Sequence, residues 1–206
     1  MRIITMSPDA WQMAHQAISA GELVVFPTDT VYGVACDPHN PSAIDRLFAA
    51  KGRGYDKPIP LLLSDAEQVR SVSPGLNAPA LKLGRHLWSG PLTLVVPRAP
   101  GLPENLGGGQ TIAVRVPGHA ELRAFLARCG GYLAVTSANL SGRPDALTAD
   151  EAAAYLDQSV EIIVDGGAVG GGVPSSVIDC TVSPPALLRE GAIPASRIAE
   201  ILGEPV

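Results

Sequence analysis

Cysteine and histidine are scarce in this chain of 206 residues, which contains three cysteines and four histidines. Cys36, Cys129 and Cys180 lie far apart and leave one thiol unpaired in any disulfide scheme, and no C-x-x-C pair occurs. The histidines do not form an H-x-x-x-H pair, so no dedicated metal site is predicted. These absences exclude a disulfide framework and a zinc knuckle.

Long apolar runs are also missing. No run approaches the ~20 residues of a membrane-spanning helix, and residues 1–20 lack the apolar core of a signal peptide. We therefore expect a cytoplasmic protein without a membrane partner. The net charge of −5 argues against a surface that coats nucleic acid generally, although it leaves a local basic cleft open.

The common signatures of nucleotide and acyl-transfer sites are absent. The sequence contains no G-x-x-x-x-G-K-[ST], no strand-linked G-x-G-x-x-G and no G-x-S-x-G. The glycine-rich stretches 107–109 and 166–172 are interpreted as connections rather than as phosphate cradles. Any phosphate binding must therefore come from scattered side chains.

The pattern of apolar residues predicts one α/β domain over residues 1–206, with an open mixed sheet flanked by helices. Ser7-Pro8-Asp9 and Asn40-Pro41 are typical helix starts, and Thr148 with Glu151 forms a capping box. Further helices are predicted at 77–88, 119–128 and 195–202. The predicted strands are 23–25, 59–63, 92–97, 111–116, 132–136, 161–164, 175–181 and 186–189.

Four polar segments interrupt this pattern: 27–33, 51–57, 111–117 and 136–142. They supply hydroxyls, amides and cations, which together suit a phosphoanhydride ligand. No covalent nucleophile with a neighbouring base accompanies them. The composition therefore favours catalysis by positioning and electrostatics.

Each segment also has an ordinary structural explanation. The cations from Lys51 to Lys57 suit a helix C-terminus, where each stabilises the dipole by ~0.3–1 kcal/mol. Arg115 alone is typical of a solvated strand residue, and the stretch TSANLSG can bond its own backbone. If Lys51 is an exposed residue at a helix end, Lys51→Ala should lower turnover far more than stability.

Seven motifs nevertheless occur in one order over residues 20–193: PTDTVYG, K-G-R with a following K-P, SGPLTLV, TIAVRVPGH, TSANLSGRP, PSSVID and LLREGAI. With this set the chain closely resembles the YrdC-like family of threonylcarbamoyl-AMP synthases. The resemblance implies an open twisted sheet with a basic concave face. It also implies condensation of L-threonine, bicarbonate and ATP, with Mg²⁺ accompanying ATP and pyrophosphate released.

The resemblance assigns roles to individual residues. Residues expected to bind L-threonine are Thr30, Tyr32, Arg115, Ser137 and Ser175. Residues expected to bind ATP are Arg53, Lys57, Thr111, Asn139 and Arg189. Lys51 and Arg53 form the K-x-R signature and are the expected catalytic residues. The expected partner is the downstream machinery that transfers the threonylcarbamoyl group to tRNA.

One position departs from the family pattern. The chain reads KPIPLLLSD, with Leu62 where many members have histidine, and the extra Pro60 alters the local geometry. No additional C-terminal domain is expected after the closing helix. Two alternatives stay open: a module that binds structured RNA, even weakly, without chemistry, and a YrdC-like paralogue that acts on another substrate.

Overall fold

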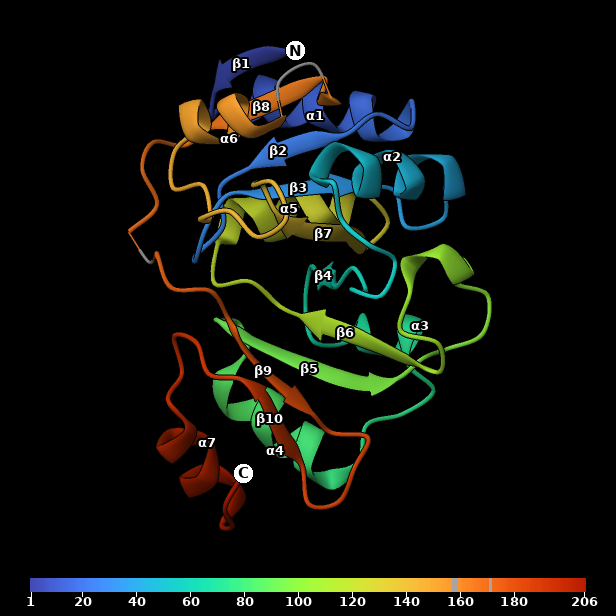
Figure 1. Cartoon of the computed structure of the whole chain (residues 1–206), viewed down its shortest axis with the longest axis vertical. Helices are drawn as coiled ribbons and strands as arrows, with labels where there is room; N and C mark the ends of the chain where they lie inside the picture. Colours follow the sequence, from blue (N-terminus) through green and yellow to red (C-terminus); the bar gives the residue numbers. More distant parts are fainter. Residues whose placement is uncertain (157–158, 171) are drawn as a thin grey trace.

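The computed structural model describes residues 1–156, 159–170 and 172–206. In this part of the chain the strands form one ten-stranded mixed sheet, in the order β1-β8-β2-β3-β7-β4-β6-β5-β9-β10 (Figure 1). The sheet contains parallel pairs, such as β1 with β8 and β5 with β9, and antiparallel pairs, such as β3 with β7. The expected open α/β sheet is confirmed.

Strands and helices are interspersed along the chain rather than strictly alternating, because several strands follow one another directly. The strands are β1 (Arg2–Thr5), β2 (Val24–Phe26), β3 (Gly33–Cys36), β4 (Leu61–Leu63), β5 (Leu92–Pro97), β6 (Thr111–Arg115), β7 (Tyr132–Ser137), β8 (Ile162–Asp165), β9 (Ser176–Asp179) and β10 (Ala186–Arg189). The helices are α1 (Pro8–Ser19), α2 (Pro41–Lys51), α3 (Val69–Val72), α4 (Ala78–Leu87), the 3-10 turn η1 (Glu104–Leu106), α5 (Ala120–Arg128), α6 (Ala149–Leu156) and α7 (Ala195–Leu202).

The predicted helix starts are confirmed by their hydrogen bonds. Ser7 Oγ accepts from the Ala10 amide at 3.2 Å, and Asn40 Oδ1 accepts from the Ala43 amide at 3.2 Å. At α6, Thr148 Oγ1 accepts from the Glu151 amide at 3.2 Å. These side chains satisfy donors that the first turn of a helix leaves unpaired.

The sequence prediction misses two strands, β1 and β3. The strand β1 is mostly exposed, so it lacks the apolar alternation that marks a strand. The strand β3 follows the polar stretch 27–32 directly and pairs antiparallel with β2, Phe26 opposite Gly33. The polar stretch is therefore the connection of a hairpin, and both of its ends are fixed in the sheet.

Two apolar cores cover the two faces of the sheet. Trp11 of α1 and Phe125 of α5 pack in one core, whereas Leu47 of α2 and Leu83 of α4 pack in the other. Side chains alternate along a strand, so Leu61 and Leu63 enter the second core and Leu62 the first. The face with α1 and α5 also carries the polar residues described below.

No helix in the described ranges is long and apolar enough to cross a membrane. The stretch 166–172, interpreted from sequence as a connection, includes Gly171, which lies outside the described residues.

Candidate functional site

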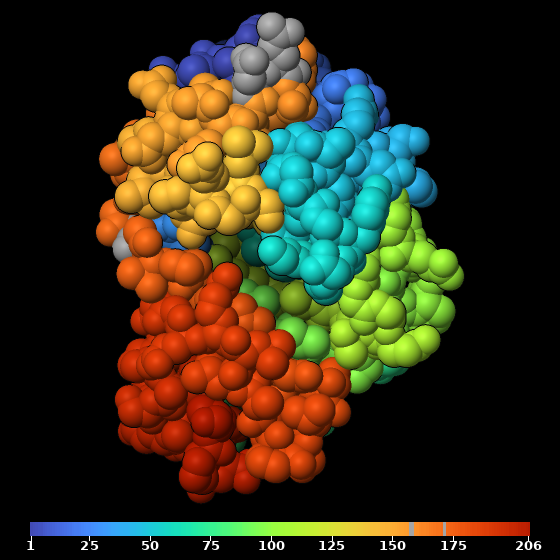
Figure 2. Space-filling model, in the orientation of Figure 1, coloured from blue at the N-terminus to red at the C-terminus, as the bar shows by residue number. Residues whose placement is uncertain are grey.

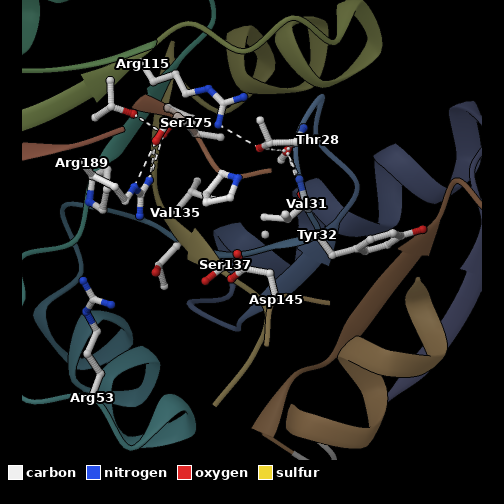
Figure 3. A pocket seen from close by; sticks show the side chains of 17 residues that line it. Thr28, Val31, Tyr32, Arg53, Arg115, Val135, Ser137, Asp145, Ser175 and Arg189 are labelled. Atoms are coloured by element: carbon white, nitrogen blue, oxygen red, sulfur yellow. Dashed lines mark hydrogen bonds between the residues drawn. The ribbon is translucent and has the colours of Figure 1, made fainter. Parts of the chain in front are cut away.

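A pocket with a cavity volume of about 170 Å³ opens on the sheet. It is lined by the connection 28–33, by strands β4 to β7 and by loops that contain Asp145 and Ser175 (Figure 3). Figure 2 shows this side of the molecule hollowed between cyan, yellow and orange-red parts of the chain. The enclosed volume is below the ~300–1,000 Å³ of drug-sized sites. It therefore suits a small ligand group, with any larger ligand extending outward.

Neighbouring strands form the floor of the pocket. Leu62 on β4 is the register partner of Arg115 on β6, and both line the pocket. The flanking residues Val114 and Val116 enter the opposite core, as the alternation along a strand predicts. Gly33 leaves little space at the edge, since a Cβ there would lie 2.9 Å from Val135 Cγ1.

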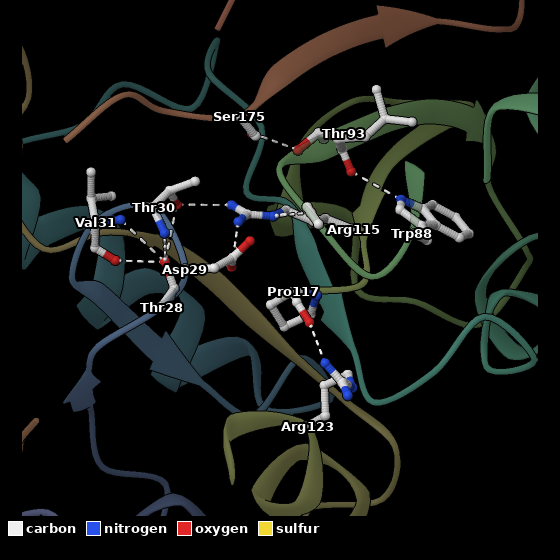
Figure 4. Close-up of polar contacts among 12 residues, drawn as sticks. Thr28, Asp29, Thr30, Val31, Trp88, Thr93, Arg115, Pro117, Arg123 and Ser175 are labelled. Carbon is white, nitrogen blue, oxygen red and sulfur yellow. Dashed lines mark hydrogen bonds and ion pairs between the residues drawn. The ribbon is translucent and has the colours of Figure 1, made fainter. Parts of the chain in front are cut away.

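Arg115 is buried, with 6% of its surface exposed. Its Nε donates to Gly90 O at 3.0 Å and Nη1 to Thr30 Oγ1 at 3.1 Å, and Nη2 pairs with Asp29 Oδ1 at 2.6 Å (Figure 4). The interpretation of Arg115 as a solvated strand residue is therefore wrong. The arginine is a fixed part of the wall, oriented by three protein oxygens.

The connection between β2 and β3 folds around Thr28. Its Oγ1 donates to Val31 O at 2.7 Å and accepts from the amides of Thr30 and Val31 at 3.1 and 3.2 Å. The two threonine hydroxyls lie 3.0 Å apart. Thr30 is thereby held between Thr28 and Arg115 at the pocket wall.

Ser175 and Arg189 form the wall on the β9–β10 side. Arg189 Nε and Nη2 donate to Ser175 O at 3.1 and 2.8 Å, and Ser175 Oγ lies 2.8 Å from Thr93 Oγ1. Desolvation lowers the pKa of Arg189, and Arg115 acts in the same direction, whereas Asp145 opposes it. A guanidinium stays charged despite such a shift, so Arg189 remains a cation.

Arg53 reaches the pocket from the turn after α2. Its Nε donates to Lys57 O at 2.8 Å and its Nη2 to Pro58 O at 3.0 Å. Lys57 itself is exposed and does not line the pocket. What Lys57 contributes to the geometry is its backbone carbonyl, which orients Arg53.

Lys51 differs most from expectation, because it is buried with 2% of its surface exposed. Its Nζ donates to Ser137 O, to Asn139 O at 2.6 Å and to Asn139 Oδ1 at 3.2 Å. Burial and the neighbouring Arg53 together lower the pKa of Lys51 to about 8, against an opposing effect of the Asp145 carboxylate. The interpretation of Lys51 as an exposed helix-end cation is therefore wrong. Its ammonium group instead binds the turn at residues 136–139 (TSAN) without lining the pocket.

Tyr32 lines the pocket, but its phenol ring points away from the cavity (Figure 3). Its ring is fully buried, and its hydroxyl donates to Gly167 O at 2.7 Å and accepts from the Gly166 amide at 3.2 Å. Desolvation raises the pKa of Tyr32 to about 12, with the nearby Asp165 carboxylate contributing. Its phenol ties the segment after β8 to the connection that forms the pocket wall.

The structure brings together most of the residues selected from the sequence. Those lining the pocket are Thr30, Tyr32, Arg53, Arg115, Ser137, Ser175 and Arg189. Lys51, Lys57, Thr111 and Asn139 do not line it. Asn139 supports the wall, since its Oδ1 accepts from Ser137 Oγ at 2.5 Å. The hydroxyl of Thr111 donates to Gly108 O at 3.0 Å, at the far end of β6 from Arg115.

Three further lining residues, Thr28, Thr93 and Asp145, were not among those predicted from the sequence. Thr28 was detectable, because it belongs to the same polar stretch as Thr30. Thr93 is a single hydroxyl in an apolar strand, and only the alternation of β5 could have placed it on this face. Asp145 lies in a loop whose path the sequence does not determine.

The lining combines three arginines with one carboxylate, Asp145, so fixed positive charge predominates. Such a site can bind an anion through charged hydrogen bonds. Within the described residues no group of three or more His, Cys, Asp or Glu side chains could hold a metal ion.

An open mixed sheet with an arginine-lined pocket on one face defines an α/β protein with a small-molecule site. Residues 16–191 match the family model Sua5_yciO_yrdC, described as telomere recombination. The chain belongs to the Sua5/YciO/YrdC family.

Curated relatives extend this match. The threonylcarbamoyl-AMP synthase of Pyrococcus abyssi is 38% identical over 188 residues, which is 91% of this chain and 55% of the relative. The putative threonylcarbamoyl-AMP synthase of Mycobacterium tuberculosis H37Rv is 39% identical over 91% of this chain and 86% of the relative. The chain thus spans about half of the Pyrococcus protein and most of the mycobacterial one.

Solved structures agree with the fold. The crystal structure of P. abyssi Sua5 complexed with L-threonine superposes with a TM-score of 0.95 at 36% identity, covering 100% of this chain and 62% of that chain. Escherichia coli YciO superposes with a TM-score of 0.87 at 23% identity, over 96% of this chain and 98% of that one, and supports the fold alone.

Proposed function

We propose that this protein is a threonylcarbamoyl-AMP synthase, which makes threonylcarbamoyl-AMP from L-threonine, bicarbonate or CO₂, and ATP. One observation carries the proposal: Thr30, Arg115, Ser137 and Ser175 line one small cationic pocket. The pocket occurs in a fold that superposes on P. abyssi Sua5, a protein seen complexed with L-threonine. The names of the curated relatives also support the proposal.

The proposed reaction needs no covalent enzyme intermediate. The neutral amino group of threonine adds to CO₂ and releases a proton to water, which gives a carbamate, and a carbamate oxygen then attacks the α-phosphorus of ATP. The bond to the bridging oxygen breaks, and pyrophosphate leaves with the electron pair. The chain's own contribution is orientation of the substrates and stabilisation of charge on the phosphates, a role for Arg53 and Arg189.

In the proposed binding mode Arg115 and Thr30 hold the threonine carboxylate, and Ser137 lies at the junction of the two substrates. Lys51, Asn139 and Tyr32 act indirectly, because their polar groups hold the loops that form the wall. Lys57 and Thr111 remain proposed nucleotide contacts outside the enclosed pocket.

Mg²⁺ is proposed to accompany ATP, where it would neutralise phosphate charge. Mg²⁺ commonly relies on one or two carboxylates together with substrate phosphates. The described lining offers Asp145 as its one carboxylate, so the donor set fits a metal held mainly by ATP.

The product would pass to the machinery that modifies tRNA, and we propose a cytoplasmic location. The alternative of an RNA-binding module is not favoured. The net charge of −5 opposes it, as does a pocket in which hydroxyls are enclosed rather than spread along a surface.

The experiment is incubation of the protein with α-labelled ATP, bicarbonate and L-threonine, followed by measurement of labelled threonylcarbamoyl-AMP and of pyrophosphate. We expect threonine-dependent release of pyrophosphate that stops when EDTA removes Mg²⁺. Release with serine or another amino acid but not with threonine would favour the paralogue alternative, for which Leu62 is the motivating departure. No amino-acid-dependent release with any divalent metal would refute the proposal.

A further inference from the structure

Asp145 is a carboxylate in the pocket wall that has no assigned contact with the amino-acid substrate. It lies in the loop between β7 and α6 and is partly buried. Among the described residues its side chain takes part in no hydrogen bond or ion pair, although three arginines line the same pocket. A carboxylate kept in a cationic pocket without a protein partner is free to accept hydrogen bonds from a ligand.

Asp145 is not paired as a counter-ion with any of the three guanidinium groups that line the pocket. All three nitrogens of Arg115 already bond protein oxygens. Arg53 and Arg189 each use Nε and Nη2 on backbone carbonyls, and no bond of their Nη1 groups occurs in the described chain. The pocket therefore offers a ligand both arginine donors and a free carboxylate.

Asp145 and Arg115 belong to different parts of the wall. In the close-up Asp145 lies beside Ser137, whereas Arg115 lies near Thr28 and Ser175 (Figure 3). The Asp145 carboxylate raises the pKa values of Lys51 and Arg189. Its charge therefore acts on the part of the wall formed by the TSAN turn and β10. A ligand seated between the two groups experiences opposite charges at its two ends.

We propose that Asp145 accepts hydrogen bonds from the amino group of the amino-acid substrate and makes the pocket selective for a zwitterion. This inference rests on the proposed function and assigns one half of its substrate recognition. The carboxylate of the amino acid meets the arginine side, and its ammonium group meets Asp145. A des-amino hydroxy acid, which carries only the negative charge, loses this contact and meets an uncompensated carboxylate.

The test compares two ligands on the full chain by calorimetric titration: L-threonine and 3-hydroxybutyrate, which has the same carbon skeleton without the amino group. The variants are Asp145→Asn, which keeps the shape and removes the charge, and Asp145→Ala in case the first does not fold. The matched control is Asp150→Asn, which removes an exposed carboxylate outside the pocket lining. Melting temperatures verify that each variant is folded.

For the wild type we expect L-threonine to bind at least about tenfold more tightly than 3-hydroxybutyrate. Because a hydrogen bond between charged groups is lost, Asp145→Asn should weaken threonine binding by about 10- to 100-fold. Binding of 3-hydroxybutyrate should change by less than about threefold or improve, so the discrimination disappears. Asp150→Asn should keep the wild-type preference.

Two results would overturn the inference while leaving the proposed function intact. One is an unchanged ratio of threonine to hydroxybutyrate affinity in both Asp145 variants. The other is a loss of Mg²⁺–ATP affinity as large as the loss for threonine, which would make Asp145 a metal or nucleotide contact. Absence of threonine binding by the wild type would instead contradict the proposed function itself, and this inference with it.

Discussion

Replacing Lys51 by methionine should destabilise the protein strongly, because Lys51 is a buried support of the TSAN turn. Methionine retains a flexible apolar side chain but lacks the ammonium donors. Its introduction removes the ammonium donor from two backbone oxygens, Ser137 O and Asn139 O, whereas Asn139 Oδ1 keeps its hydrogen bond from Ser137 Oγ. The site is 2% exposed, so water cannot replace the lost donors without local opening.

The magnitude follows from two opposing contributions. A buried polar group that loses its partner costs ~1–3 kcal/mol, and two such carbonyls would cost roughly twice that amount. Removing a buried ammonium recovers part of its desolvation cost, which is several kcal/mol for a buried ion. We expect a net loss of about 2–4 kcal/mol in the free energy of unfolding, or roughly 4–16 °C in Tm for a chain of this size.

Urea denaturation at pH 7 measures this loss, and Lys82→Met is the matched control. Lys82 is an exposed lysine on α4 whose one hydrogen bond, to Leu202 O at 3.2 Å, is also exposed. The control should change the free energy of unfolding by less than ~0.5 kcal/mol. A loss below ~0.5 kcal/mol in Lys51→Met would show that the ammonium does not support the turn.

The same lysine predicts a pH dependence. Its pKa is about 8 in the folded protein, below the ordinary 10.5 of an unfolded lysine. Between these values the unfolded chain binds more protons, so the stability of the wild type relative to Lys51→Met should rise from pH 8 to pH 10.5. The full rise is about 3 kcal/mol. If the difference in stability between the wild type and Lys51→Met does not change from pH 8 to pH 10.5, burial of the charge does not lower the pKa of Lys51.

Three further changes test the pocket. Arg115→Lys should weaken threonine binding by ~1.5–3 kcal/mol and affect ATP much less, because an ammonium cannot reproduce the guanidinium contacts; calorimetry showing equal losses would contradict this. Tyr32→Phe should cost ~1 kcal/mol at pH 7, because the bond to Gly167 O is lost. The pKa of Tyr32 is about 12 in the folded protein and 10.0 in the unfolded chain. The stability of the wild type relative to Tyr32→Phe should therefore fall as pH rises above 10. Urea denaturation of both proteins at pH 8 and pH 11 checks this. Gly33→Ala places a Cβ 2.9 Å from Val135 Cγ1 and should lower the free energy of unfolding by ~1–3 kcal/mol and weaken threonine binding. A variant with the Tm and the threonine affinity of the wild type would show that the wall has room for the methyl group.

Local signals made most of the fold predictable. Ser7, Asn40 and Thr148 cap helices through side-chain bonds to amides within three residues, so their sequence neighbours suffice. The run 92–97 coincides with β5 because one of its faces is entirely apolar. By contrast β3 has four buried residues, GVAC, without β-branched enrichment, and only its position between β2 and β7 makes it a strand.

The site residues were predictable where a motif places polar or charged side chains near the end of a strand, as for Thr30, Arg115 and Ser137. The resemblance to a family located these residues, but it did not say which of them reach the cavity. Lys51 shows why: a cation at a helix end is normally solvated, and its burial depends on carbonyls 86 and 88 residues away in sequence. Asp145 was missed because it lies in an irregular loop, where no periodicity in the sequence indicates which way a side chain points.

The strand order has a consequence for how the chain is made. Arg2 of β1 pairs with Ile162 of β8, 160 residues later, so at roughly 5–20 residues per second a growing chain waits about 8–30 s for this partner. Meanwhile α1 has no Phe125 to cover Trp11 until α5 is synthesised. Arg189 belongs to β10, the last strand in chain order among the described residues, and completes the pocket. A nascent chain therefore has unpaired sheet edges until β8 is synthesised, and its binding site is complete only after Arg189 has been added.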